Sequence, residues 1–510
     1  MGNSVRVRFA PSPTGPLHIG GVRTALYNFL FARQKGGSFI LRIEDTDRNR
    51  YVEGAEQYIT ESLKWCGLEF DESPDRGGPF APYRQSERSD IYSKYIHKLI
   101  ESGHAYFAFD TEEELDQRRE SCKESKDIFT YDHHSRTYLI NSLTLSRQET
   151  EHKLRSGVPY VIRVKIPENE KVIVNDLIRG EVVVETNNLD DKVLFKSDGL
   201  PTYHLANVVD DYLMKITHVI RGEEWLPSAP LHVLLYRFFG WENSMPEFAH
   251  LPLILKPDGN GKLSKRDGDR LGFPVFPMAW KDPVSGEIFS GYRESGYLPE
   301  AFLNIMVHLG WNPGTDRELF TLTELTEEFS LHRVGKHGSK FDVEKARWFN
   351  HQYLQLSSDE DLYGYIQPYL REHSINPSKN LAVHILHLIK DRAFLIPDLW
   401  SQSWFFFIRP REFDNAVYQK IWKPDTAQTI SDFCRELKEA SVFNKEELQP
   451  FIQDFAARKS LKMGQLMNPL RLMAVGSNQG PGMIDIMLAL GEEEFISRIE
   501  EGMIRLTSST

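Results

Sequence analysis

The fold of this chain is decided by the stretch Arg8–Gly21, which reads RFAPSPTGPLHIGG. Just before and within it, apolar residues at positions 5, 7 and 9 alternate with arginines, a period of two that predicts a short strand. Prolines and glycines then interrupt the pattern before residues 22–34, which have the composition of a helix. The first N–H groups of a helix are unpaired and lie at the positive end of its dipole, so a strand, a rigid loop and a helix start together form a phosphate site. We expect His18 to contact a nucleotide phosphate there. Alone, the pattern His-x-Gly-Gly is weak, because many loops contain it by chance.

A second cationic motif lies far along the chain, at residues 262–266, which read KLSKR. The Gly-rich segment PDGNG precedes it at residues 257–261. Three cations in five residues on such a loop suit a polyphosphate that gains charge during phosphoryl transfer. Taken alone, this pentapeptide fits a solvated turn equally well.

Together the two motifs resemble the ATP-binding motifs of class I aminoacyl-tRNA synthetases, which are written HIGH and KMSKS. The first motif and three further ones resemble bacterial-type glutamyl-tRNA synthetases more closely: LRIEDTD at 41–47, PTYHLANVVDD at 201–211 and HVIRGEEW at 218–225. The motifs follow one another in the family's order. The likeness runs from Arg8 to the region of Pro469-Leu470-Arg471, so it covers nearly the whole chain.

The resemblance implies an α/β fold, in which a class I Rossmann-like nucleotide-binding catalytic domain is interrupted by an inserted module that binds the acceptor end of tRNA. An all-helical anticodon-binding domain follows. We expect the catalytic domain at 1–85 and 200–255, the inserted module at 86–199, a stem-contact region with the KLSKR loop at 256–340, and the helical domain at 341–510.

Local patterns support this organisation. Residues 38–43 read as a second strand, and strand–helix–strand at this spacing predicts a right-handed βαβ unit with parallel strands. The patterns predict helices at 86–101, 112–120 and 301–311, strands at 160–166 and 180–185, and sheet residues again at 200–211. Helical periodicity dominates from residue 341 onward. The run WFFF at 404–407 is interpreted as core rather than as base-stacking residues, because consecutive aromatics cover both sides of an element.

Length and composition limit the class of protein. A chain of 510 residues is long enough for about three or four domains, and 40% hydrophobic and 12% aromatic residues indicate a globular protein. The three cysteines, Cys66, Cys122 and Cys434, form no CxxC pair, which favours a reducing compartment. No stretch approaches the roughly 20 apolar residues of a membrane helix. We therefore expect a cytoplasmic protein with no membrane partner, and a monomer.

The net charge of −12 does not exclude an RNA partner, because RNA binding needs a local basic surface rather than a basic total. Basic residues cluster at 333–347 and at 458–471. By itself, each cluster is more typical of a solvated face. Only the resemblance makes them candidates for a surface that binds tRNA.

The resemblance implies activation of L-glutamate by ATP, followed by transfer to the 3′ end of tRNA(Glu) with release of AMP and pyrophosphate. Lys265 is the first choice for pyrophosphate contact, with Lys262 and Arg266 assisting. His18 holds the phosphates from the opposite side, so His18, Lys262 and Lys265 are the expected catalytic residues. Positions that match the family's ATP contacts are His18, Gly20, Gly21, Glu224, Leu255, Lys262, Leu263, Ser264, Lys265 and Arg266.

Glutamate needs cations for its carboxylates and an anion for its ammonium group. Arg8 and Arg221 suit the carboxylates, because a guanidinium binds a carboxylate in a bidentate manner. Glu44 follows the second strand and suits the ammonium group, since ligands bind at strand ends of open α/β sheets. Tyr203 and Asn207 lie four apart and can share a helix face. Positions that match the family's amino-acid pocket are Arg8, Ala10, Ser12, Glu44, Tyr203, Asn207 and Arg221.

Two departures from the pattern affect the chemistry. The first motif ends in Gly21 where the general class I pattern has a second histidine, a change that relatives tolerate. Many relatives carry a CxC zinc site in the insertion, where this chain has Phe107-Ala108-Phe109, and Cys122 with His133-His134 lacks zinc-finger spacing. We therefore expect no structural zinc and no protein-held metal, with Mg²⁺ present as the companion of ATP.

Two other functions remain open at this point. A tRNA-binding or regulatory relative without catalysis would have kept the fold, although the intact His18, Glu44, Arg221 and Lys265 argue against it. A shorter relative modifies tRNA(Asp), but it lacks an anticodon domain. Whether tRNA(Gln) is charged as well does not follow from one sequence; we expect an enzyme that discriminates against it.

Overall fold

The computed structural model describes residues 4–124, 128–264 and 267–508. The chain divides into two compact units, the first comprising Met1–Glu294 and Phe302–Val343 and the second Ser295–Ala301 and Glu344–Thr510. Among the described residues, no helix has both the length and the apolar character needed to cross a membrane. Lys265 and Arg266 lie outside the described residues. The four domain boundaries expected from the sequence stay predictions.

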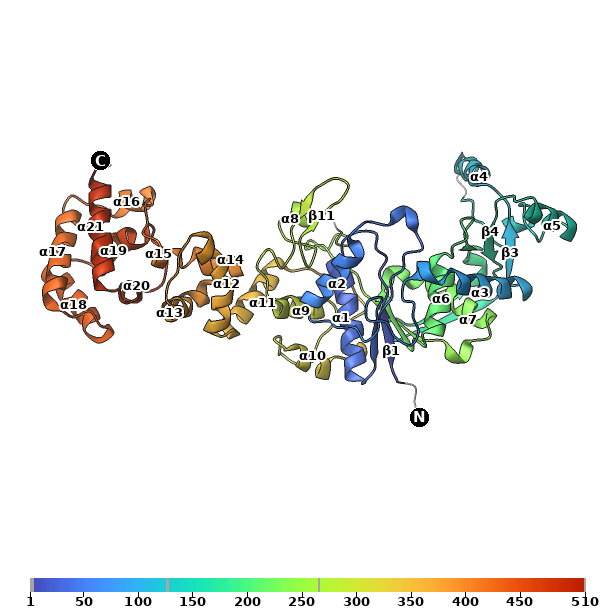
Figure 1. Ribbon diagram of the computed structural model, residues 1–510, viewed down its shortest axis with the longest axis horizontal. Helices are drawn as coiled ribbons and strands as arrows, with labels where there is room; N and C mark the ends of the chain where they lie inside the picture. Colours follow the sequence, from blue (N-terminus) through green and yellow to red (C-terminus); the bar gives the residue numbers. More distant parts are fainter. Residues whose placement is uncertain (1–3, 125–127, 265–266, 509–510) are drawn as a thin grey trace. The chain divides into compact units, whose positions relative to one another are not determined.

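The first unit opens with the predicted strand–helix–strand unit, drawn in blue in Figure 1. Strand β1 (Arg6–Phe9) is followed by helix α1 (Ile19–Gln34) and strand β2 (Ser38–Leu41). The two strands pair in parallel from Arg6 opposite Ser38 to Phe9 opposite Leu41, which confirms the parallel arrangement. Helix α1 begins before residue 22, because the His18 side chain caps it by accepting the Gly20 N–H at 3.1 Å.

A four-stranded sheet continues the unit in the order β6-β5-β9-β8. Its strands are β5 (Lys171–Asp176), β6 (Gly180–Glu185), β8 (His218–Gly222) and β9 (Glu247–Leu251). Strand β9 pairs in parallel with both β8 and β5, whereas β5 and β6 form an antiparallel hairpin. The Thr217 N–H donates to the Arg6 carbonyl at 2.9 Å, so β8 starts beside β1. Strand β5 meets β9 at its last residue, Asp176, which lies opposite Phe248.

The prediction of sheet residues at 200–211 is wrong. Residues Tyr203–Leu213 form helix α6, which packs with α3 (Ser89–Glu101) and α7 (Ala229–Phe238) in one hydrophobic core. Residues 205–211 are all buried, polar ones included. The segment is short and mostly buried, and at this length periodicity alone does not distinguish a buried helix from a buried strand.

The segment 86–199, expected to be an inserted module, contains an antiparallel sheet of β3 (Ala105–Ala108), β4 (Val161–Val164) and β7 (Val193–Phe195), in the order β3-β4-β7. Helices α4 (Glu112–Glu124) and α5 (Arg147–Arg155) belong to the same segment. The helices expected at 86–101 and 112–120 and the strands expected at 160–166 and 180–185 are confirmed as α3, α4, β4 and β6.

The rest of the first unit consists of short elements. They are α2 (Ala55–Trp65), β10 (Ile254–Leu255), α8 (Asp267–Leu271), β11 (Trp280–Lys281), β12 (Ile288–Phe289), α10 (Leu322–Glu328) and β13 (Ser339–Lys340). Helix α9 (Pro299–His308) lies where a helix was expected at 301–311, and its residues are divided between the two units. Strand β10 pairs in parallel with β13.

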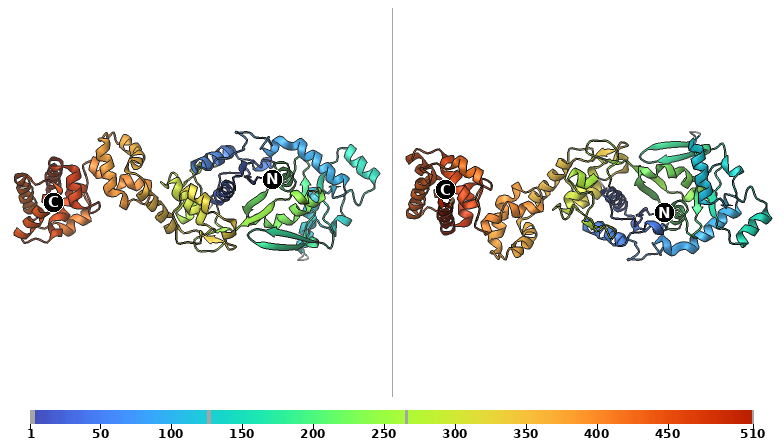
Figure 2. Two further views of the ribbon diagram at one scale, coloured as in Figure 1. Left: turned by 90° about the horizontal axis from the view of Figure 1, so that it is seen from below. Right: turned by 90° about the horizontal axis from the view of Figure 1, so that it is seen from above.

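The second unit is helical throughout its described residues, shown from two sides in orange to red in Figure 2. Its helices after α9 are α11 (Val343–Leu356), α12 (Asp359–Glu372), α13 (Lys379–Ile389), α14 (Ile396–Ser401), α15 (Trp404–Phe407), α16 (Asn415–Ile421), α17 (Thr426–Ala440), α18 (Lys445–Arg458), α19 (Met463–Val475), α20 (Met483–Leu490) and α21 (Glu492–Ser508). Helix α15 buries Phe405 and Phe406 in the core, against which Trp404 and Phe407 also pack, so the interpretation of WFFF as core is confirmed.

Candidate active site

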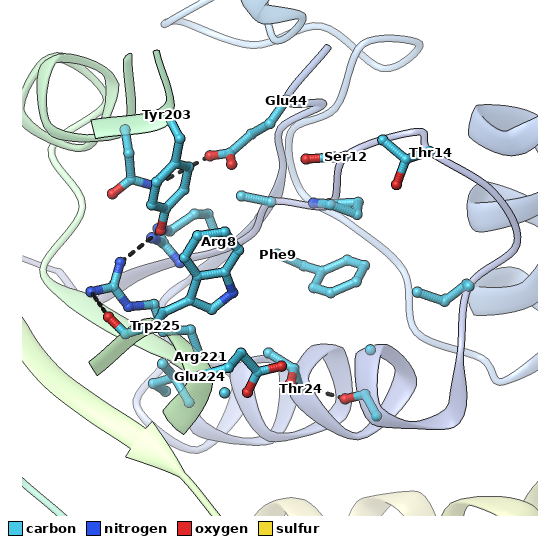
Figure 3. A pocket seen from close by; sticks show the side chains of 18 of the residues that line it. Arg8, Phe9, Ser12, Thr14, Thr24, Glu44, Tyr203, Arg221, Glu224 and Trp225 are labelled. Atoms are coloured by element: carbon cyan, nitrogen blue, oxygen red, sulfur yellow. Dashed lines mark hydrogen bonds between the residues drawn. The ribbon is translucent and has the colours of Figure 1, made fainter. Parts of the chain in front are cut away.

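A pocket of about 360 Å³ opens in the first unit, between β1, the start of α1, α6 and β8 (Figure 3). Ten residues predicted from the sequence line it: Arg8, Ala10, Ser12, Gly20, Gly21, Glu44, Tyr203, Asn207, Arg221 and Glu224. Of the predicted residues that the structure describes, five lie outside the lining: His18, Leu255, Lys262, Leu263 and Ser264. The structure therefore brings the whole expected amino-acid pocket together, and only part of the expected ATP site.

Two glycines that line the pocket have no room for a side chain. A Cβ at Gly21 would lie 2.5 Å from Leu17 Cδ1, and one at Gly222 would lie 2.1 Å from Glu224 Oε2. Contacts this short are not tolerated without displacement of a neighbour. The glycine at position 21 thus has a steric reason that does not depend on the predicted phosphate site.

Arg8 is held on the floor of the pocket by a buried ionic network. Its Nε and Nη2 donate to the Asp211 carboxylate at 3.0 and 3.2 Å. Arg42, which is fully buried, donates to Asp211 at 2.7 Å and to Glu44 at 3.0 Å. Asp211 takes the Nε and Nη2 groups of Arg8. The Nη1 group of Arg8 makes no hydrogen bond to a described residue.

Glu44 offers an anion to the same pocket. Its Oε1 accepts hydrogen bonds from Arg42 at 3.0 Å and from Asn207 at 3.2 Å, and its Oε2 has no such partner in the described part of the chain. Burial raises the pKa of Glu44, whereas Arg42 and Arg8 act in the opposite direction. The positive charges of Arg42 and Arg8 favour the carboxylate form of Glu44, which can receive an ammonium group.

Arg221, at the end of β8, has a different environment from Arg8. Its Nη1 donates to the Tyr203 hydroxyl at 2.7 Å and lies 3.4 Å from His232 Nδ1, and its Nε donates to His250 Nε2 at 3.0 Å. Tyr203, Arg221 and Trp225 lie on one side of the pocket in Figure 3, with Ser12 and Thr14 across from them. Among the described residues, no carboxylate contacts this guanidinium directly.

The histidines behind Arg221 are neutral. Burial lowers the pKa of His232 well below its usual value, and the charge of Arg221 acts in the same direction. Burial also lowers the pKa of His250, although the hydrogen bond to Asp176 opposes this effect. Arg221 therefore presents a positive charge that its immediate neighbours do not cancel, which suits an anionic group of a ligand.

The second motif reaches the pocket through an ion pair. Lys262 Nζ lies 2.8 Å from Glu224 Oε1, and both side chains are about half exposed. Burial alone would raise the pKa of Glu224, but the hydrogen bond from Lys262 lowers it overall. An ion pair this exposed contributes at most about 1 kcal/mol to stability, so its significance is positional.

The motif residues next to Lys262 are anchored by the fold. Leu263 is buried and its N–H donates to the Ile254 carbonyl at 2.9 Å. The Ser264 N–H and hydroxyl donate to Asp267 at 2.9 and 2.6 Å. Leu255 forms a bridge with Lys262 and pairs with β13. These contacts fix residues 262–264 within the first unit.

Several residues at the site were not identified from the sequence. Arg50, Thr24 and Trp225 line the pocket. Asp211 bonds to Arg8, and Asp176 bonds to His250, which in turn accepts from Arg221. Asp211 and Trp225 lie at the ends of the motifs PTYHLANVVDD and HVIRGEEW, whereas no local pattern marks Asp176 or His250.

Among the described residues, no three side chains of His, Cys, Asp or Glu form a group that could hold a metal ion. The expectations about zinc and Mg²⁺ stay predictions.

Comparisons with known proteins agree with this geometry. The family model for class I (E and Q) tRNA synthetases, catalytic domain, matches residues 4–348, and the model for an anticodon binding domain matches residues 361–503. The glutamate–tRNA ligases of Phocaeicola vulgatus and Bacteroides fragilis are 56% and 55% identical to the chain over 500 residues, which cover 98% of each chain.

A solved structure is similar over the same length. The crystal structure of a glutamate tRNA ligase from Elizabethkingia meningosepticum in complex with its amino acid has 51% sequence identity and a TM-score of 0.95, and the match covers 99% of this chain and 100% of that one. The pocket, the two motifs and these similarities lead to one assignment: the chain belongs to the glutamate–tRNA ligase family of class I aminoacyl-tRNA synthetases.

Proposed function

We propose that the chain activates L-glutamate with ATP and transfers the glutamyl group to the 3′ end of tRNA(Glu). The observation that carries this proposal is the pairing of charges across the pocket. Arg221 has a positive charge with neutral neighbours, and Glu44 offers an unoccupied carboxylate oxygen. Glutamate has the complementary groups, a side-chain carboxylate and an ammonium.

In this proposal Arg221 and the Tyr203 hydroxyl bind the side-chain carboxylate of glutamate. Glu44 receives the ammonium group, and Asn207 orients Glu44. The Nη1 group of Arg8 is available to a carboxylate, and the backbone at Ala10 and Ser12 completes the pocket. Glutamine would leave the charge of Arg221 without a partner, which costs binding energy because the guanidinium is buried.

The first chemical step is a displacement at phosphorus. An oxygen of the glutamate α-carboxylate attacks the α-phosphorus of ATP, a new P–O bond forms, and the bond to the bridging oxygen of pyrophosphate breaks. Negative charge develops on the transferring phosphoryl group and on the departing pyrophosphate. The Gly20-Gly21 helix start and the cations Lys262 and Lys265 suit the stabilisation of this charge. Mg²⁺ enters with ATP as the counter-ion of its phosphates and is part of the nucleotide substrate.

The second step transfers the acyl group. A ribose hydroxyl of the terminal adenosine attacks the activated carbonyl carbon, and AMP leaves. This sequence needs no covalent enzyme intermediate. The protein contributes mainly by holding three ligands in reactive positions.

A charging assay tests the proposal. Purified protein with ATP, Mg²⁺, tRNA(Glu) and labelled glutamate should give acid-precipitable label, and labelled glutamine should give at most about one hundredth of it. Equal charging with glutamine would contradict the substrate. The same assay with tRNA(Gln) tests discrimination: we expect much lower catalytic efficiency than with tRNA(Glu), and comparable efficiency would show that both tRNAs are charged.

A further inference from the structure

Arg221 is held from behind by an aspartate and a histidine that belong to neighbouring strands. Asp176 ends β5, His250 lies in β9, and Arg221 lies in β8 directly opposite His250. Asp176 Oδ2 lies 2.6 Å from His250 Nδ1, and His250 Nε2 accepts from Arg221 Nε at 3.0 Å. The side chains of Asp176 and His250 are fully buried. Asp176 and His250 form a line of hydrogen bonds that ends at the Arg221 guanidinium.

Elementary hydrogen-bond rules settle the direction of this line. A carboxylate only accepts, so His250 carries its hydrogen on Nδ1. A neutral imidazole with Nδ1–H has a lone pair on Nε2, and Arg221 Nε–H only donates. The carboxylate of Asp176 therefore selects the one neutral form of His250 that can accept from Arg221. The pKa of Asp176 is lowered despite burial, through its bonds to His250 and to backbone N–H groups, so it remains a carboxylate.

We propose that Asp176 and His250 are positioning residues that orient the Arg221 guanidinium toward the side-chain carboxylate of glutamate. This inference rests on the proposed function, because it needs glutamate at Arg221. A guanidinium is planar and its N–H groups are fixed in direction, so a rotation about its long axis misaligns the bidentate contact. Tyr203 and His232 hold Nη1, and the Trp225 carbonyl lies 3.4 Å from Nη2, but of the described residues only His250 holds Nε.

A purely structural role for Asp176 is the alternative. Its Oδ1 accepts from the backbone N–H groups of Ile178 and Arg179 at 2.9 and 2.7 Å, which stabilises the turn between β5 and β6. Oδ2 makes the bond to His250 Nδ1 and also accepts from the His250 backbone N–H at 3.1 Å. Substitution of the His250 side chain leaves all of these backbone bonds in place, so it separates the two roles.

The first variant is Asp176→Asn. With its oxygen toward the turn, the amide retains both turn bonds, places an NH₂ group opposite His250 Nδ1 and loses the bond from the His250 backbone N–H. His250 then has to carry its hydrogen on Nε2, where it faces the N–H of Arg221. We expect the KM for glutamate, measured by ATP–pyrophosphate exchange in the presence of tRNA, to rise about tenfold to a hundredfold, the usual effect of losing one charge-assisted bond. The KM for ATP should change less than about twofold.

The sign of the effect separates positioning from simple electrostatics. Asp176→Asn removes a negative charge near the site, which by itself would strengthen the attraction of Arg221 for a carboxylate and lower the KM for glutamate. A rise in this KM is therefore the signature of a misplaced guanidinium. A fall, or no change in a variant with a wild-type Tm, would overturn the inference.

A matched pair at His250 decides the question if Asp176→Asn does not fold. Glutamine can place an amide oxygen near the former Nε2 and accept from Arg221, whereas asparagine can reach Asp176 but not Arg221. We expect His250→Gln to stay within about threefold of the wild-type KM for glutamate and His250→Asn to resemble Asp176→Asn. Equal KM values in the two His250 variants would contradict positioning.

Two further measurements complete the test. Arg221→Lys lacks the Nε–H group, so Asp176→Asn added to it should raise the KM for glutamate less than about twofold further. Full additivity would place the effect of Asp176 elsewhere. Calorimetric titration of wild-type protein with glutamate distinguishes failure of the proposed function from failure of this inference. A wild type that does not bind or charge glutamate refutes the proposed function, whereas normal glutamate use in both the wild type and Asp176→Asn refutes only the inference.

Discussion

At the scale of single residues, the two adjacent glycines of the first motif have different reasons to be glycine. A Cβ at Gly21 would lie 2.5 Å from Leu17 Cδ1, and Leu17 is only 7% exposed, so it has little room to move. A Cβ at Gly20 would have its nearest contact at 3.4 Å, with His18 Nδ1. We therefore predict that Gly21→Ala destabilises the first unit by about 1–3 kcal/mol, whereas the matched Gly20→Ala leaves its Tm unchanged or higher, since alanine favours a helix. Calorimetry of both variants checks this, and equal losses of Tm would refute the steric reason.

At the scale of elements, the contact between α6 and α7 depends on uncharged imidazoles. His204 Nδ1 lies 3.4 Å from His232 Nε2, and burial, with Lys192 and Arg221, lowers the pKa of His204 to about 4. In the unfolded chain this pKa is about 6.5, so below pH 6.5 the unfolded state binds the proton first and stability falls as the pH drops towards 4. We predict that His204→Gln removes this loss of stability at low pH. Relative to wild type, the variant should gain about 2 kcal/mol in unfolding free energy between pH 7.5 and pH 5.0, measured by denaturant titration. Parallel pH profiles would contradict it.

At the scale of the whole molecule, the site and the helical anticodon-binding region belong to different units. Every pocket-lining residue precedes residue 226, and the anticodon-domain match begins at residue 361. We predict that a fragment ending at Val343 binds ATP and glutamate but charges tRNA at least about a hundredfold less efficiently, because the terminal ribose is no longer positioned. Titration calorimetry and a charging assay measure both properties. Undiminished charging would show that the second unit does not guide the tRNA.

The residue at which that fragment ends decides whether the first unit keeps Phe341. Phe341 is buried in the first unit, stacks on Phe273 at 4.8 Å, and donates its N–H to the Leu255 carbonyl. A fragment ending at Lys340 loses this side chain, and we expect it to be less stable than the fragment ending at Val343 by about 3–5 kcal/mol, the usual cost of deleting a buried phenylalanine. Thermal unfolding of the two fragments is the comparison. Equal Tm values would show that Phe341 is dispensable for the first unit.

The sequence by itself determined the features that depend on near neighbours. Alternation before residue 10, the break at the prolines and the helical run after Gly21 were enough to predict the β1–α1–β2 unit, and helical periodicity was enough for the second unit. The amino-acid pocket was predicted through the family's motifs, and the structure places all of those residues around one cavity. Their roles remain proposals.

Only the tertiary structure decided the rest. Residues 203–213 form a helix that packs against α3 and α7, and over so short a buried segment the sequence pattern does not distinguish a helix from a strand. Asp176 and His250 lie 74 positions apart and meet because β5 and β9 are neighbours in the sheet. Arg8 likewise finds Asp211 across 203 positions. Periodicity reports only on local conformation, whereas the partners of a buried charge are set by the order of strands and the packing of helices, which brings distant parts of the chain within hydrogen-bonding distance.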